Sequence, residues 1–298
     1  MPRDLYSKYV WILETVKRYG AITREDLSER WLRSQVSDGQ PLARRTFFNY
    51  RQAIEEIFNV NIIFNKATNE YSIEENNVNP HMTDWVLNSL STMNLLNDSR
   101  DIADSIFLEE IPSAKDYLSL AIDALKNRSR MKFTYNSYTR PLPTKGIVLE
   151  PYFLKLFRQR WYVTGKVVRD KTVKTYALDR MADATLLPET YEIPESFDAR
   201  LYSRDSFGIV FNNSKAVNVI LKVMPGQAKY FRALPLHKSQ EERVSDGYSI
   251  FSYRLKLTDD FIQELMSHGA SITVLEPPEL RDRIVENLNK TLRNYEND

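Results

Sequence analysis

Cationic and aromatic side chains alternate in one short stretch of this 298-residue chain, from Gln159 to Met181. The stretch reads QRWYVTGKVVRDKTVKTYALDRM and contains two β-type runs joined by a charged turn. Guanidinium groups make charge-assisted, often bidentate bonds to anions, and tyrosine rings offer faces on which another ring can stack. These residue types therefore predict a surface for an anionic ligand that carries a ring.

The net charge of the chain is concentrated in the same region. Residues 115–185 hold 15 Lys/Arg and 6 Asp/Glu, a net charge of +9, whereas residues 1–75 hold 11 of each. Residues 76–114 carry −5 and residues 186–298 carry −3. Concentrated positive potential attracts polyanions and raises their encounter rate. A lysine-rich solvated surface is the alternative, and the interleaved aromatic residues favour the binding surface.

Composition and motifs argue against several classes of protein. The chain has no cysteine and three histidines, and it contains no P-loop, G-x-G-x-x-G, H-E-x-x-H or G-x-S-x-G motif. We therefore expect no enzyme, no cofactor and no metal site. The first 20 residues carry charges throughout, and no apolar run approaches the ~20 residues of a membrane span. We expect a cytoplasmic protein that has no contact with a membrane.

Residues 1–75 have the pattern of a DNA-binding domain. Helical periodicity predicts helices over residues 6–19, 23–32 and 42–58, with Thr23 as the N-cap of the second, and two alternating runs within residues 62–73 predict a β-hairpin. Three helices followed by a hairpin form the layout of a winged helix-turn-helix, whose third helix enters the major groove. The segment is similar to the winged-helix domains that precede ligand-sensing modules in bacterial regulators.

The third helix supplies the candidate contacts to duplex DNA. Arginine and asparagine make bidentate bonds to guanine and adenine edges, and they cluster near the start of this helix. A solvated helix face is the alternative, because the domain carries no net charge and the link before the helix is longer than the usual 3–4 residues. The candidate DNA-binding residues are Arg44, Arg45, Thr46, Asn49, Tyr50 and Arg51.

A helical connector is expected over residues 76–114, and a small β-barrel over residues 115–190. After a helix at 114–126, short strands are expected at 132–135, 146–154, 160–167, 173–178 and 182–187. Five short antiparallel strands favour a small barrel. Alternation places Trp161 and Val163 on one face of their strand, and we expect Trp161 in the core.

This middle segment resembles the WYL domain, a family with an SH3/Sm-like barrel that occurs mostly behind a winged helix in bacterial transcription regulators. The resemblance rests on RWYVTG, KTYALDRM, TYNSY and LEPYFL, with Val163 where the family has leucine. It implies that the domain senses a ligand, proposed for the family to be a nucleotide or single-stranded nucleic acid. The ligand-binding residues implied here are Tyr135, Ser137, Tyr152, Arg160, Tyr162, Tyr176 and Arg180.

Residues 205–298 predict a ferredoxin-like domain. Their β and helical runs follow one another in a βαββαβ order, and a helix opens after Pro277 and Pro278. The ending HGASITVLEPPELRDRIVENL resembles the C-terminal extension that often accompanies WYL domains. The fold class expected for the whole chain is therefore α+β and multidomain.

Two functions remain open at the level of sequence. The leading one is a ligand-responsive, DNA-binding transcription regulator, a homodimer on a double-stranded operator, whose barrel senses the nucleotide or single-stranded nucleic acid. The alternative is a nucleic-acid-binding accessory protein whose basic barrel, rather than the winged helix, makes the main contact.

Overall fold

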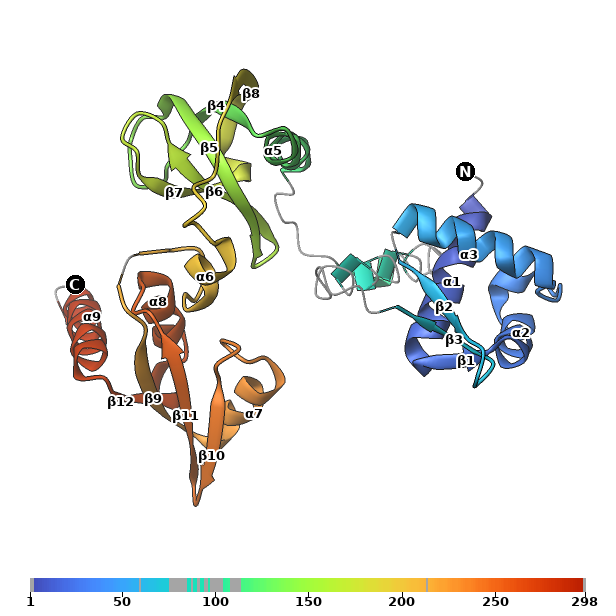
Figure 1. The fold of residues 1–298 in the computed structure, drawn as a ribbon. Coiled ribbons are helices and arrows are strands. Elements are labelled where there is room, and N and C mark those ends of the chain that lie inside the picture. Colours follow the sequence, from blue (N-terminus) through green and yellow to red (C-terminus); the bar gives the residue numbers. More distant parts are fainter. Residues whose placement is uncertain are drawn as a thin grey trace. The chain divides into compact units, whose positions relative to one another are not determined.

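The computed structural model describes residues 3–58, 60–74, 114–212 and 214–296, together with isolated positions at 85, 86, 88, 89, 92, 93, 96 and 104–107. The chain forms two compact units, Met1–Glu109 and Glu110–Asp298, whose elements are drawn in Figure 1. Their sheets have three, five and four strands, so the chain is a mixed α/β, multidomain protein, as expected. The helical connector expected at 76–114 lies largely outside the described residues. No helix in the described ranges is long and apolar enough to span a membrane.

Three helices and a small antiparallel sheet form the N-terminal unit. The elements in chain order are α1 (Arg3–Tyr19), β1 (Ala21–Thr23), α2 (Arg24–Leu32), the 3-10 turn η1 (Gln35–Ser37), α3 (Arg44–Phe58), β2 (Ile62–Asn65) and β3 (Glu70–Ile73). The sheet order is β1-β3-β2, so the strand before α2 joins the hairpin that follows α3.

The core of this unit follows the helical periodicity of the sequence. The buried residues of α1 include Tyr9, Ile12, Leu13 and Val16, which recur at helical spacing. Thr23 caps α2 as expected, because its hydroxyl accepts a bond from the Asp26 amide at 3.1 Å and donates to the Asp26 carboxylate at 2.8 Å. Leu27 and Trp31 of α2 are buried, whereas Leu32 at the end of the helix is 49% exposed.

A helix and five antiparallel strands form the first part of the second unit. These elements are α5 (Lys115–Asn127), β4 (Ser129–Tyr135), β5 (Thr144–Phe157), β6 (Arg160–Val167), β7 (Val173–Ala177), the 3-10 turn η3 (Leu178–Arg180) and β8 (Met181–Thr190). The strand order β7-β6-β5-β4-β8 returns the last strand to the edge of the first. All five expected strand segments lie within these strands, except that Leu178 begins η3.

Strands β5 and β6 approach each other closely at one glycine. Gly165 lies opposite Pro151, next to an irregularity in the register between Pro151 and Phe153. A Cβ atom at Gly165 would lie 2.2 Å from the carbonyl oxygen of Glu150 and 2.9 Å from the Cα of Pro151. Backbone atoms cannot move aside as a flexible side chain would, so this position requires glycine.

A four-stranded sheet with helices forms the rest of the unit. After α6 (Ala199–Arg204), its elements are β9 (Val217–Val223), α7 (Pro225–Ala233), β10 (Glu241–Ser245), β11 (Tyr248–Leu255), α8 (Asp259–Ser267), the 3-10 turn η4 (Gly269–Ser271), β12 (Ile272–Glu276) and α9 (Pro278–Glu296). The sheet order is β10-β11-β9-β12, and every neighbouring pair is antiparallel. From β9 to β12 the elements follow the βαββαβ order expected from the sequence.

Strand β10 begins at Glu241, and the preceding residues from Leu236 form a loop. The side chain of Gln240 holds the preceding loop, because its oxygen accepts from the Leu236 amide at 3.1 Å and its nitrogen donates to the Phe231 carbonyl at 2.7 Å. These bonds take the place of a strand ladder.

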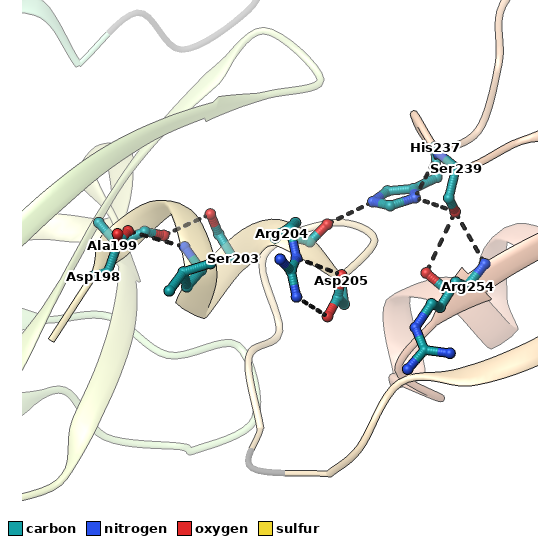
Figure 2. A network of polar contacts seen from close by, with 9 residues as sticks. Asp198, Ala199, Ser203, Arg204, Asp205, His237, Ser239 and Arg254 are labelled. Carbon is teal, nitrogen blue, oxygen red and sulfur yellow. Dashed lines mark hydrogen bonds and ion pairs between the residues drawn. The ribbon is translucent and has the colours of Figure 1, made fainter. Parts of the chain in front are cut away.

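His237 in this loop belongs to a polar network that also includes the end of α6 (Figure 2). Its Nε2 lies 2.7 Å from the Arg204 carbonyl, to which it must donate, and its Nδ1 accepts from the Ser239 amide at 3.2 Å. This pattern needs the neutral imidazole with the proton on Nε2. Burial lowers the pKa of His237 in agreement with that state.

The tip of the β5–β6 hairpin contacts the C-terminal domain of the same unit. Phe157 packs against the core of that domain, with its ring centroid 5.6 Å from that of Phe207. Arg158 forms an ion pair with Glu264 of α8. The β5–β6 hairpin thus attaches the five-stranded sheet, which carries the Gln159–Met181 stretch, to the domain with the four-stranded sheet.

We expect Gly165→Ala to lower the free energy of unfolding of the second unit by about 1–3 kcal/mol, because the new methyl group overlaps backbone atoms of β5. Urea titration followed by circular dichroism measures the change. Gly226→Ala is the matched control, since Gly226 has open space around its Cβ position, and its substitution is expected to be neutral or stabilising by up to ~1 kcal/mol. An unchanged urea midpoint for Gly165→Ala would contradict the close approach.

Stability should fall as the pH drops from about 7 to about 5. The pKa of folded His237 lies below its ordinary value of 6.5, so the unfolded chain takes up the proton first and unfolding becomes more favourable. Thermal unfolding of the wild type and of His237→Gln across this range tests the assignment. The variant should lose part of the pH dependence, and parallel curves for the two proteins would refute the role of His237.

Candidate functional sites

The seven ligand-binding residues expected from the sequence separate into three groups in the five-stranded sheet and its surroundings. Tyr135, Ser137 and Tyr176 line a cavity, and Arg160, Tyr162 and Arg180 lie in a second group with Asp179. Tyr152 lies in neither group. The structure therefore does not bring the seven residues together into one site.

The cavity lies between the β4–β5 connection and the β6–β7 turn and has a volume of about 390 Å³. Its wall includes Tyr135 and Tyr176, whose ring centroids are 4.9 Å apart at an interplanar angle of 79°. The Tyr135 hydroxyl accepts a bond from the Ala177 amide at 3.3 Å. Burial raises the pKa of Tyr176 to about 12, so its phenol is neutral at physiological pH. The cavity thus has an aromatic wall without negative charge.

Four cationic side chains also line the cavity, and the sequence analysis did not select them. They are Arg140, Lys145, Arg169 and Lys174. Their loops meet because β5 pairs with β6: Leu149 lies opposite Val167, and the Val168 amide donates to the Val148 carbonyl at 2.9 Å. The net charge of +9 in residues 115–185 was the available signal, but it does not say which cations converge.

The second group is centred on an ion pair. Arg160 bonds to Asp179, whose side chain is only 7% exposed, and this bond raises the pKa of Arg160. The guanidinium of Arg180 lies 3.9 Å from the ring centroid of Tyr138. The buried Nε atoms of both arginines and Oδ1 of Asp179 have no hydrogen-bond partner among the described residues. The partner of Asp179 in the structure is thus Arg160.

Tyr162, next to this pair, is 8% exposed, and burial raises its pKa. Trp161, which was expected in the core, is half-buried and packs against the core cluster that contains Val163. Tyr152 is 7% exposed, and its ring lies 4.7 Å from that of Phe197 in a separate aromatic cluster. Its hydrophobic surroundings assign Tyr152 to packing.

On α3, the candidate DNA-binding residues differ in their exposure. Arg44, Arg45 and Asn49 are exposed, whereas Thr46 and Arg51 are half-buried. Arg51 forms an ion pair with Glu55 at 3.1 Å. The ring of Tyr50 packs towards the core, with centroids 5.2 Å from Tyr9 and 6.2 Å from Trp31.

Two family models match the chain. The WYL domain model matches residues 116–186, and the WCX domain model matches residues 215–292. The chain therefore contains a WYL domain followed by a WCX domain. The resemblance inferred from RWYVTG and its flanking motifs is confirmed.

Individual relatives are distant. Protein PafB of Mycobacterium leprae (strain TN) is 23% identical over 188 residues, which are 62% of this chain and 55% of that protein. The solved structure of proteasome accessory factor B/C (PafBC) of Arthrobacter aurescens has 16% identity and a TM-score of 0.36, with 96% of this chain and 46% of that chain covered. A crystal structure of a CRISPR Cas-related protein has 12% identity and a TM-score of 0.39, with 62% and 53% covered. The chain thus spans about half the length of these relatives.

Removing the carboxylate of Asp179 should destabilise the second unit. Asp179→Asn leaves the charge of Arg160, 25% exposed, without its partner, and we expect a loss of about 2 kcal/mol, less than the 3–5 kcal/mol of a fully buried pair. Urea denaturation measures it. Glu286→Gln, which removes one carboxylate of an ion pair whose side chains are each 64% exposed, should leave the midpoint close to that of the wild type. Equal effects of the two substitutions would contradict the structural importance of the Arg160–Asp179 pair.

Proposed function

We propose that this protein is a ligand-responsive, DNA-binding regulator of transcription. In this proposal the N-terminal unit is a winged helix-turn-helix that binds duplex DNA, and the WYL domain is an SH3/Sm-like barrel that binds a nucleotide or a single-stranded nucleic acid. The WCX domain is ferredoxin-like. The role is one of binding, not of catalysis.

One observation carries the DNA-binding part. Arg44, Arg45 and Asn49 are exposed within the first six residues of α3 (Arg44–Phe58), and the β2–β3 hairpin follows that helix directly. In winged helix-turn-helix proteins, residues near the N-terminal end of the third helix reach base edges and phosphates. Exposed arginine and asparagine are the side chains that make bidentate contacts to guanine and adenine.

The role of Tyr50 changes within this proposal. Its ring is packed on Tyr9 and Trp31, so it supports the orientation of α3 and does not stack on DNA. Thr46 and Arg51 stay candidates for phosphate contacts at the edge of the same face. A homodimer would present two copies of α3 to the half-sites of a pseudo-palindromic operator.

A second candidate function is supported by the distribution of charge. The segment 115–185 carries +9 and residues 1–75 carry no net charge, so the WYL domain is the more strongly attractive part for a polyanion. An accessory protein that contacts nucleic acid mainly through this domain would need no specific duplex contact by α3.

Replacement of two arginines on α3 distinguishes these functions. We expect Arg44→Ala/Arg45→Ala to weaken duplex binding about tenfold or more and to lower the slope of log affinity against log salt by about 1–2, because each contact to a base edge or phosphate is lost. Fluorescence anisotropy with duplexes selected from a random library measures both quantities.

The control is Arg24→Ala/Arg33→Ala, which removes the same charge from the first residue of α2 and from its C-cap. Each of these arginines forms an ion pair with a glutamate of α2. The duplex affinity of this control should stay near that of the wild type. If the α3 variant binds duplex as the wild type does, the regulator proposal fails and the accessory function is favoured.

A further inference from the structure

In the Arg160 group the positive charge is already neutralised by a carboxylate. In the cavity of the WYL domain most of the positive charges are not. Asp170 is the one carboxylate in the cavity lining, and it is bound by the cation of Lys174. The Asp170 carboxylate also accepts bonds from the Thr172 amide at 3.1 Å and the Thr172 hydroxyl at 2.6 Å. Asp170 and Lys174 therefore satisfy each other within the turn.

Three cations of the cavity lining have no such partner. Within the described ranges, Arg140, Lys145 and Arg169 form no ion pair. Nη1 of Arg140 donates a long hydrogen bond of 3.4 Å to the Thr144 hydroxyl. All three residues are exposed to solvent, so a ligand can reach their side chains. Three unneutralised cations around one concave site are suited to a phosphate group.

The Arg160 group has the opposite character. Its guanidinium is bonded to Asp179, and the second carboxylate oxygen of Asp179 is buried beside it without a partner. An incoming phosphate would meet that carboxylate at short range, and like charges in a poorly solvated place repel strongly. The pair therefore stabilises the fold better than it binds an anion.

The rest of the cavity fits the part of a ligand that is not charged. Apolar side chains of Ile147 and Val167 lie in the wall beside Tyr135 and Tyr176. The volume of about 390 Å³ lies within the range of roughly 300–1,000 Å³ typical of small-molecule sites. A nucleoside with one phosphate matches this cavity. It has an anionic group at one end for the cations and a flat, largely apolar ring at the other end for the wall.

We propose that this cavity is the ligand site of the WYL domain and that it binds one phosphorylated nucleoside. Arg140, Lys145 and Arg169 hold the phosphate, and the base lies against the wall formed by Tyr135, Ile147 and Val167. The proposal rests on the proposed binding of a nucleotide or single-stranded nucleic acid by this domain. The nucleoside is either a free nucleotide or one unit of a single strand.

The test is a set of binding measurements on the full-length protein at low salt. The probes are a nucleoside 5′-monophosphate, the same nucleoside without phosphate, inorganic phosphate, and a short single-stranded oligonucleotide. The variant Arg140→Ala/Arg169→Ala should weaken binding of the nucleotide or oligonucleotide about tenfold or more for each guanidinium removed. The charge-matched control Lys126→Ala/Lys132→Ala removes two exposed lysines that do not line the cavity and should bind as the wild type does.

The comparison of probes identifies the ligand. Tighter binding of the monophosphate than of the oligonucleotide supports a free nucleotide, and the reverse order supports a single strand. Binding of the nucleoside or of inorganic phosphate as tight as that of the monophosphate overturns the assignment of a phosphorylated nucleoside. Hydrogen exchange gives an independent readout, because bound ligand should protect the β4–β5 connection and the β6–β7 turn in the wild-type protein.

Two outcomes overturn the location of the site. The first is loss of binding in Arg160→Ala together with wild-type binding in Arg140→Ala/Arg169→Ala, which would return the ligand to the Arg160 group. The second is the absence of binding by every probe to the wild type. Neither outcome affects duplex binding by α3, so failure of this inference is distinguishable from failure of the DNA-binding proposal.

Discussion

The pairing of β5 with β6 is the constraint on which the rest of the WYL domain depends. Its register, with Leu149 opposite Val167, brings the β4–β5 connection against the β6–β7 turn and so forms the cavity. The same hairpin ends in Phe157 and Arg158, which contact the WCX domain. Gly165 permits this register because it has no side chain, and any larger residue would overlap the backbone of β5. One pair of strands therefore determines both the candidate ligand site and the attachment of the domain to its neighbour.

Ion pairing divides the cations of the domain into two kinds. Arg160 forms an ion pair with the buried carboxylate of Asp179, and Lys174 forms one with Asp170 in its own turn. The other cations of the cavity lining form no ion pair among the described residues; they are Arg140, Lys145 and Arg169, and they surround one cavity. Buried charge requires a partner because desolvation is costly, whereas exposed charge near a concave wall is available for an external anion. The basic character of the segment is thus partly structural and partly available for binding.

Local signals in the sequence predicted local structure well. The Thr23 cap, the buried stripe of α1 and the bounds of β6 all depend on residues close together in the chain. Which residues form the Arg160 group and which line the cavity depends on contacts between residues far apart in the chain. Arg160 and Asp179 lie 19 positions apart and meet through the turn η3, and the loops around Arg140 and Arg169 meet through strand register. Alternation along a strand does not encode these contacts. The family resemblance grouped Tyr152 with residues from which the structure separates it.

A ligand-responsive regulator requires that the ligand change affinity for DNA, and a ligand does so only if it binds two states of the protein with different affinity. The most direct measurement is the dissociation constant of a selected duplex with and without saturating nucleotide or oligonucleotide. The account predicts a shift of about 5–150-fold in the wild type. It also predicts no shift in Arg140→Ala/Arg169→Ala, whose duplex affinity without ligand should stay unchanged. Equal duplex affinity of the wild type in the presence and absence of saturating ligand would contradict the account.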